Sequence, residues 1–445
     1  MNDDGQETSV GRQIESVAVL GCGTMGSGIA AASAAAGCRV LMLDVTIDAA
    51  ARGLQAVDEA HRHLVEIGTF AELPRIADFD WICEAIVEDL ATKRRLFAEL
   101  EPLRADGSVV SSNTSGIPLR DIAAGMPERF QADVAITHFF NPVRVMRLFE
   151  LVPGEHTSAE VIDAFARFGA TRLGKGVVHA KDTVNFIGNR IGCFFMLSGL
   201  HLAKAFLAAG MSQETVNAAL GKPVGLPPTG LYGLIDLIGL DVMDLVGKNL
   251  AINLPANDPG RAFTAFPPAE QRMLERGQLG RKARELGGFG RVTKSPDGEK
   301  RSETFDLLTE EWRDAVAPDL EAVASDVLAS PGELLFHDSD AGRLAWQVFG
   351  GTLRYAAGLV PEIADDIVNI DHAIRWGFNW VHGPFEMLDA VGPSRVIDRI
   401  RAEGGEVPAM LAVLANSGSP TFYRSAADGG REYLGRDGSW NPVPT

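Results

Sequence analysis

The stretch Val17–Asp44, VAVLGCGTMGSGIAAASAAAGCRVLMLD, places a cluster of glycines between two apolar runs and ends on an acid. Residues 16–20 have the length and apolar character of a short buried strand. Residues 26–37 are dominated by alanine, isoleucine and glycine at spacings that suit a helix. The stretch therefore predicts a strand, a glycine-rich turn, a helix and a second strand.

The turn carries Gly21, Gly23 and Gly26 in the spacing GxGxxG. In a dinucleotide-binding turn the first glycine permits the tight bend, the second lets the backbone approach a pyrophosphate, and the third lets the helix pack on the strand. Residues 39–43 form the second apolar run, and Asp44 follows it, where a carboxylate accepts from a ribose 2′-hydroxyl and repels a 2′-phosphate. The sequence predicts an NAD site in preference to NADP, and a simple packing turn is the alternative for the glycines taken alone.

More strand-like segments follow at residues 81–88, 107–115 and 132–142, and helical patterns such as 90–103 separate them. Strands that alternate with helices predict right-handed crossovers and a parallel sheet. Ligands bind at the carboxyl ends of the strands in such sheets. We therefore expect the functional residues just beyond these segments.

The length of 445 residues predicts two to four compact domains, and the composition, 46% hydrophobic and 22% charged, is typical of a soluble globular protein. The formal net charge of −18 argues against general affinity for nucleic acid or anionic lipid. Four cysteines lie scattered without CxxC spacing, so we expect reduced thiols, no disulfide framework and no metal site.

Targeting signals are not indicated by the sequence. Residues 1–13 are polar and acidic, which is typical of a flexible tail and not of a secretion signal, so we expect a cytoplasmic protein. The most apolar segment, 186–206, is interrupted by Asn189, Arg190 and Lys204, and we expect it not to cross a membrane.

Four polar residues could form an acid–base site: Ser115, His138, Glu150 and Asn189. A histidine with a carboxylate partner can take a hydroxyl proton while a hydride leaves the same carbon. Ser115 and Asn189 can hydrogen-bond the oxygen on which charge changes. In the alternative interpretation, the histidine is a structural residue, the glutamate lies on a solvated strand, and the serine and asparagine cap helices.

Four motifs, GCGTMGSGIA, SSNTSGI, THFFNPVRVMRLFELVPG and KDTVNFIGNRI, occur in this order over about 190 residues. Together they closely resemble the L-3-hydroxyacyl-CoA dehydrogenases of fatty-acid β-oxidation. The resemblance implies that His138 is the base, that Glu150 is its partner, and that Ser115 and Asn189 contact the substrate. It implies an α/β Rossmann-like NAD-binding domain followed by two all-α C-terminal-type domains.

The remaining site residues are assigned in two groups. The expected cofactor site consists of Gly21, Gly23, Thr24, Met25, Gly26 and Asp44, and the resemblance adds Glu88, Lys93, Asn113 and Ser115. The expected substrate contacts are Ser115, Asn141, Asn189 and Arg144. Arg144 and Arg147 depart from the family pattern, and solvated arginines are the equal alternative.

The region after residue 184 contains an internal similarity, because four residues of one stretch recur 153 positions later in the chain. The pairs are Arg190 and Arg343, Gly230 and Gly383, Asp236 and Asp389, and Gly239 and Gly392. We interpret this as two copies of one helical unit, as in large multifunctional β-oxidation enzymes, with ordinary similarity between helices as the alternative. A chain that carries both copies can cover its apolar face internally, so a monomer or a homodimer is expected.

The expected organisation is a tail followed by four segments. These are the tail at 1–13, the NAD-binding domain at 14–184, helical copy 1 at 185–292, a charged linker at 293–334 and helical copy 2 at 335–445.

The resemblance implies reversible NAD-dependent oxidation of an L-3-hydroxyacyl-CoA to the 3-oxoacyl-CoA, with no metal. We expect any enoyl-CoA hydratase or thiolase partner to be a separate protein. The segment between Asp44 and Trp81 is about twenty residues shorter than the resemblance leads us to expect, which leaves a carrier-protein thioester open as the substrate. An NAD-binding scaffold without catalysis is the alternative of another class.

Overall fold

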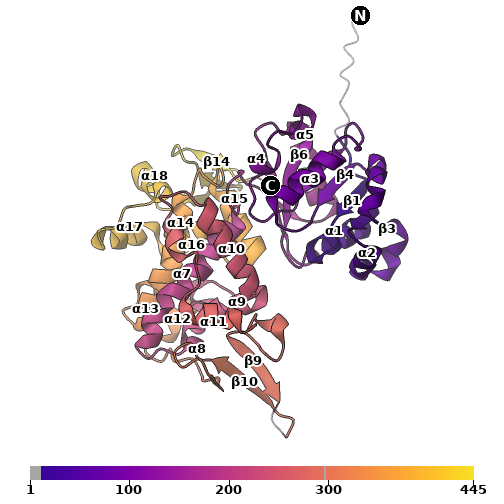
Figure 1. Cartoon of the computed structure of the whole chain (residues 1–445). Helices are drawn as coiled ribbons and strands as arrows, with labels where there is room; N and C mark the ends of the chain where they lie inside the picture. Colours follow the sequence, from indigo (N-terminus) through magenta and orange to yellow (C-terminus); the bar gives the residue numbers. More distant parts are fainter. Residues whose placement is uncertain (1–11, 295–296, 445) are drawn as a thin grey trace, which may run out of the picture. The chain divides into compact units, whose positions relative to one another are not determined.

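The chain divides into two compact units, and the boundary falls between Phe186 and Ile187 (Figure 1). A computed structural model describes residues 12–294 and 297–444. Most of the predicted tail, residues 1–11, lies outside the described residues. Each unit has its own secondary structure and core.

Unit 1 is built on an eight-stranded sheet with the order β3-β2-β1-β4-β5-β6-β7-β8. The strands are β1 (Ser16–Leu20), β2 (Arg39–Asp44), β3 (Val65–Thr69), β4 (Trp81–Glu84), β5 (Val109–Ser112), β6 (Val134–Phe139), β7 (Leu148–Pro153) and β8 (Gly176–His179). All neighbouring strands pair in parallel except β6 and β7. The predicted parallel, Rossmann-like sheet is therefore confirmed, with an antiparallel step near one edge.

Helices cover the sheet because the buried strand residues are apolar on both faces. The helices are α1 (Thr24–Ala35), α2 (Ile47–Leu54), α3 (Leu90–Leu100), α4 (Leu119–Ile122), α5 (Glu128–Asp133) and α6 (Ala159–Arg167). On one face, alternate strand residues such as Val19 and Trp81 share a core with Ile29 of α1 and Phe165 of α6.

The short segment between Asp44 and Trp81 contains α2, two 3-10 segments, η1 (Glu59–Leu64) and η2 (Phe70–Asp78), and the edge strand β3. β3 pairs in parallel with β2. The segment thus extends the sheet by one strand.

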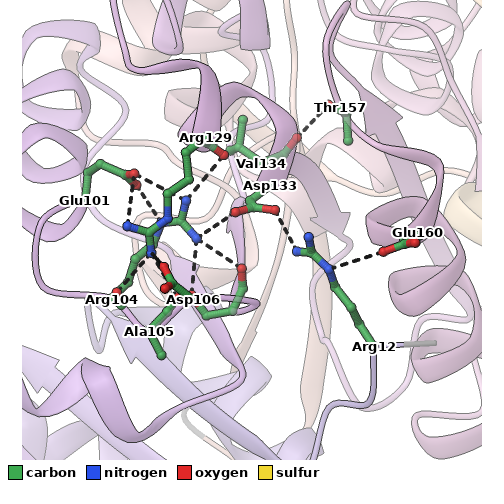
Figure 2. Close-up of polar contacts among 11 residues, drawn as sticks. Arg12, Glu101, Arg104, Ala105, Asp106, Arg129, Asp133, Val134, Thr157 and Glu160 are labelled. Atoms are coloured by element: carbon green, nitrogen blue, oxygen red, sulfur yellow. Dashed lines mark hydrogen bonds and ion pairs between the residues drawn. The ribbon is translucent and has the colours of Figure 1, made fainter. Parts of the chain in front are cut away.

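A charged network closes the amino ends of the strands (Figure 2). Arg104 is 4% exposed and pairs with Glu101 at 2.5 Å and with Asp133 at 2.9 Å. Asp133, which directly precedes β6, also pairs with Arg12 at 2.6 Å. Each buried charge of the network has a partner of opposite sign. The network can therefore hold this end of the sheet without burying an unpaired ion.

Unit 2 is mainly helical. Its helices are α7 (Gly188–Ala208), α8 (Gln213–Ala219), α9 (Gly230–Ile238), α10 (Leu240–Asn253), α11 (Pro268–Glu275), α12 (Ser325–Ala329), α13 (Asp340–Ala345), α14 (Gly351–Gly358), α15 (Ile367–Phe378), α16 (Pro384–Val391), α17 (Pro393–Ala402) and α18 (Ala409–Ser417). Within the described residues α7 alone is long and apolar enough to span a membrane by length and composition, and 61% of its most apolar window is buried. That burial is typical of a core helix.

Unit 2 also contains two small antiparallel sheets, which the sequence analysis did not predict. They consist of β9 (Gly290–Lys294), β10 (Lys300–Phe305) and β11 (Trp312–Asp314), and of β12 (Tyr423–Ser425), β13 (Arg431–Leu434) and β14 (Trp440–Pro442). The segment 293–334, expected as a linker, therefore carries β10, β11 and α12. Figure 1 shows β9 and β10 as a hairpin extending from the helices around them.

One aspartate binds the backbone at the start of each small sheet, and it is buried at Asp236 and half-buried at Asp389. Asp236 accepts hydrogen bonds from the amides of Phe289 and Gly290, both at 2.9 Å. Asp389 accepts from the amides of Phe422 at 2.6 Å and Tyr423 at 2.9 Å. Each aspartate thus links a helix to the strand that follows much later in the chain.

The buried carboxyl of Glu270 in α11 predicts a pH dependence of stability. Glu270 is 2% exposed, and burial raises its pKa from 4.5 to about 7. Between these pH values the folded chain keeps a proton that the unfolded chain has released, so this contribution to stability is complete below pH 4.5 and is lost as the pH rises through 7. We expect Glu270→Gln to lose less stability than wild type between pH 5 and 8, by on the order of 3 kcal/mol, in denaturation experiments.

Glu275→Gln is the matched control, because Glu275 is exposed on the same helix. It removes the same charge and should follow the wild-type pH curve. Parallel curves for wild type and Glu270→Gln would contradict the expectation.

Candidate active site

The three glycines of the turn between β1 and α1 meet three different surroundings. Gly21 has φ +99°, and a Cβ there would lie 2.6 Å from the carbonyl oxygen of Ala85. A Cβ on Gly26 would overlap the carbonyl oxygen of Gly21. A Cβ on Gly23 would meet no atom within 4 Å. Gly21 and Gly26 are thus required by the fold, whereas the free space above Gly23 is where a pyrophosphate would approach the backbone.

A hollow of about 280 Å³ opens beside this turn, with Gly23, Thr24, Asp44 and Arg52 among its lining residues. Asp44 ends β2, and its carboxylate accepts from the amides of Cys22 at 2.6 Å and Val45 at 2.7 Å. The remaining lone pairs of the carboxylate can accept from ribose hydroxyls. The glycine turn, the start of α1 and Asp44 therefore fit a dinucleotide.

His138 and Glu150 form a buried pair on the two antiparallel strands. They stand directly opposite each other in the register of β6 and β7. Nδ1 of His138 lies 2.6 Å from Oε2 of Glu150, and the two residues are 2% and 0% exposed. Glu150 is the third residue of its strand and not at a strand end, because β7 runs against β6.

The second ring nitrogen of His138 lies 3.2 Å from the hydroxyl of Ser115. In the tautomer that donates from Nδ1 to Glu150, Nε2 is a hydrogen-bond acceptor on the side of Ser115. The rings of Phe140 and Phe186 lie 4.7 Å and 5.5 Å from the imidazole, centroid to centroid. The imidazole is therefore held by a carboxylate and by two aromatic rings, and its Nε2 lies on the side of Ser115.

A buried lysine–carboxylate network supports the loop of Ser115. Glu88 accepts from the Ser115 amide at 3.0 Å and pairs with Lys93 at 3.2 Å. Lys93 is 1% exposed and also pairs with Glu84 at 2.7 Å. Glu88 and Lys93, both assigned to the cofactor site, thus hold the serine loop, and Glu84, which the sequence reading did not single out, completes the network.

Three other predicted residues lie around this centre. Asn113 accepts from the Phe139 amide at 2.9 Å and so joins the ends of β5 and β6. Asn141 is exposed just after β6. Arg144 is also exposed and pairs with Asp58 at 2.9 Å, which lowers the pKa of that carboxyl. Arg144 is therefore the solvated arginine that the sequence analysis gave as the alternative to a substrate contact.

Lys175 is a residue that the sequence reading missed. Its ammonium is largely buried and donates to the carbonyl oxygens of Val143 and, at 2.6 Å, of Met146. Both carbonyls belong to the turn that joins β6 to β7. Lys175 therefore holds the connection between the strands of His138 and Glu150, and only the family motif around the turn, not Lys175 itself, was visible in the sequence.

Asn189 lies in unit 2, as the second residue of α7, so unit 1 does not by itself bring it to the other three predicted residues. The chain reaches α7 through Asn185 and Phe186, which have φ of +60° and +49°. A left-handed conformation is unusual for phenylalanine and stores backbone strain. Oδ1 of Asn185 is buried and accepts no hydrogen bond from the described residues.

Comparisons with known proteins give a consistent result. The family profile "3-hydroxyacyl-CoA dehydrogenase, NAD binding domain" matches residues 16–183, and "3-hydroxyacyl-CoA dehydrogenase, C-terminal domain" matches residues 186–287. A protein of Bacillus subtilis named probable 3-hydroxyacyl-CoA dehydrogenase is 34% identical, over 93% of this chain and 55% of its own length. A protein of Deinococcus radiodurans with the same name is 31% identical, over 66% of this chain and 87% of its own length.

Among solved structures, the 3-hydroxybutyryl-CoA dehydrogenase of Escherichia coli K12 matches with a TM-score of 0.69 at 24% identity. The match covers 91% of this chain and 99% of that one. At this identity the match shows the fold. The chain spans about half the length of the curated relatives that it matches over most of its sequence.

The glycine turn yields a paired prediction. Gly23→Ala adds a methyl group in free space, so we expect the melting temperature to stay within about 2 °C of wild type while the Kd for NADH rises at least about tenfold. Gly26→Ala forces a methyl group against the Gly21 carbonyl, so we expect a loss of about 2–4 kcal/mol of folding stability. Thermal denaturation and NADH fluorescence titration measure the two effects. Equal NADH affinity for Gly23→Ala and wild type would show that the pyrophosphate does not lie on this turn.

Proposed function

The chain belongs to the 3-hydroxyacyl-CoA dehydrogenase family, and from this premise we propose that it oxidises an L-3-hydroxyacyl-CoA to the 3-oxoacyl-CoA with NAD as hydride acceptor. The observation that carries the proposal is the buried His138–Glu150 pair, with Nδ1 and Oε2 2.6 Å apart and the other imidazole nitrogen facing Ser115.

The residues at the glycine turn would hold the cofactor. NAD, when bound, accepts the hydride that leaves C3 of the substrate. The open space at Gly23 and the amino end of α1 suit a pyrophosphate. Asp44 suits a free ribose hydroxyl and disfavours a 2′-phosphate, which supports NAD over NADP.

His138 is the proposed base. Its Nε2 takes the proton of the substrate hydroxyl as the oxygen becomes a carbonyl, and the imidazole becomes a cation. Glu150 stabilises this cation in a site from which water is largely excluded, where the attraction is stronger than in solvent. A reaction in the reverse direction uses the same proton to form the hydroxyl.

Ser115 and Asn189 are the proposed substrate contacts. The Ser115 hydroxyl lies at hydrogen-bond distance from Nε2, so it can also bond the reacting oxygen and align it with the base. The role of Asn189 rests on the resemblance of KDTVNFIGNRI to the family motif. Orientation by these two groups is the main contribution, because the carbonyl product carries little charge.

We further propose that residues 185–292 and 335–445 are two copies of one helical unit. Matching contacts support this: the backbone bonds of Asp236 recur at Asp389, 153 residues later. The amide of Tyr232 donates to Asn217 and the amide of Phe385 donates to Asp371, so each of these helices is bonded to the preceding helix.

Two further statements remain proposals. A carrier-protein thioester is the second candidate substrate, since the segment after Asp44 contains only α2, η1, β3 and η2. A cytoplasmic location, with enoyl-CoA hydratase or thiolase as separate partners, is supported by four free, buried cysteines, as expected in a reducing compartment.

The proposal is tested by following NADH absorbance with 3-oxoacyl-CoA and 3-oxoacyl-carrier-protein substrates. Oxidation of NADH with the CoA substrates is the expected result, and a clear preference for the carrier protein would select the second candidate. Tight NADH binding with no turnover of any thioester would identify a scaffold protein and overturn the proposal.

His138→Gln separates catalysis from cofactor binding. Glutamine keeps a hydrogen-bonding side chain but cannot take the proton, so we expect kcat to fall by about 10²–10⁴-fold. The Kd for NADH should remain within about twofold of wild type, because His138 is not part of the glycine turn. Steady-state rates and fluorescence titration measure both values, and an unchanged kcat would refute the assigned base.

A further inference from the structure

Unit 2 contains a cavity of about 760 Å³, which is in the range of small-molecule sites. α7 forms one wall with Phe194, Ser198 and Leu202. Segment 347–362, which includes α14, forms the facing wall. Two connections complete it, 255–263 after α10 and 406–409 before and at the start of α18.

The cavity lies between equivalent parts of the two proposed copies. Adding the offset of 153 to the three α7 residues gives Gln347, Gly351 and Tyr355, and all three line the cavity. The connections that line it also correspond, since each joins the helix after Gly239 or Gly392 to the next α-helix. The cavity is thus bordered by matched elements of both proposed copies, and neither copy alone would form it.

Apart from its hydrogen-bonded polar groups, the wall of the cavity consists of apolar and aromatic side chains. Phe194 stacks on Tyr355 with centroids 4.0 Å apart, and it meets Phe263 edge-on at 5.9 Å. Leu202 and Leu359 extend this surface. Covering such a surface with a hydrocarbon group is favourable, because apolar area is removed from water.

Three of the four charged side chains that line the cavity, Asp258, Glu362 and Arg354, pair with other side chains. The guanidinium of Arg190 binds Asp258 at 2.5 Å, Tyr355 at 2.6 Å and Glu362 at 2.9 Å. Arg354, the one basic residue among the described residues that line the cavity, lies 3.9 Å from Glu403 and over the ring of Trp346. Three acidic residues line the cavity with it, namely Asp258, Glu362 and Glu406. An anionic head group is therefore disfavoured, and an uncharged chain is favoured.

The same helix links the cavity to the proposed substrate site. Asn189 lies five residues before Phe194 on α7, a rise of about 7.5 Å. We propose that the cavity holds the distal part of a long acyl chain of the substrate, so that the second copy supplies half of a chain-length specificity site. This inference rests on the proposed function of the chain.

The test fills the cavity from Gly351. A Cβ at Gly351 would meet only Arg354 Nη2, at 3.9 Å, within 4 Å, and Gly351 lines the cavity, so the ring of Gly351→Phe takes up part of its volume. Gly351→Ala is the matched control, because it makes the same change of backbone freedom with a single methyl group. NADH absorbance is followed with 3-oxoacyl-CoA substrates of four and of sixteen carbons.

We expect kcat/KM of Gly351→Phe for the sixteen-carbon substrate to fall at least tenfold, while the four-carbon value changes less than twofold. Gly351→Ala should keep the wild-type ratio of the two values. An equal loss on both substrates, or no loss on the longer one, would overturn the proposal.

A binding measurement separates this inference from the proposed function. A fluorescent, uncharged methyl ester of a sixteen-carbon fatty acid is titrated into wild type and Gly351→Phe. If wild type turned over neither thioester, the proposed function would fail, and loss of probe binding in Gly351→Phe would still support a hydrocarbon site. Equal probe binding in both proteins would overturn the cavity assignment.

Discussion

The antiparallel pairing of β6 with β7 is the constraint on which the candidate site depends. It sets His138 opposite Glu150 in register, in a position where neither side chain is more than 2% exposed. A buried carboxylate or imidazolium without a partner costs several kcal/mol, so each group makes the burial of the other tolerable. Lys175 donates to two carbonyl oxygens of the turn between the strands, and this contact keeps the register in which His138 lies opposite Glu150.

The cofactor turn and the acid–base pair are joined by direct packing. A Cβ on Gly28 of α1 would lie 2.8 Å from Cγ2 of Val143, in the turn after β6. The glycine therefore lets the helix that begins at the pyrophosphate turn lie against the connection that Lys175 holds. A shift of α1 cannot occur without moving that connection, because packed interiors transmit small displacements. The glycine turn and the His138–Glu150 pair thus belong to one packed layer.

The sequence predicted the features that depend on local chemistry, and it did not predict those that depend on contacts between residues far apart in the chain. The spacing of Gly21, Gly23 and Gly26 predicts the turn because each glycine has a steric cause within a few residues or in the next strand. The position of Glu150 within a reversed strand depends on pairing that no local pattern encodes. Lys175 binds carbonyls 32 and 29 residues earlier, and its type alone gives no sign of this. The strands β9 to β11 are mostly exposed or half-buried, so they lack the apolar period that predicts a strand.

The cavity of unit 2 has a consequence for how such a protein diversifies. Where two identical chains meet across an axis, every replacement appears on both sides at once, and a pocket on the axis must keep two equal halves. Here the two halves, which we propose to be copies, are separate stretches of one polypeptide, and their equivalent positions differ: Ser198 corresponds to Gly351, and Leu202 corresponds to Tyr355. One side can therefore acquire bulk or polarity while the other keeps its shape, which allows a lopsided pocket to evolve by single steps.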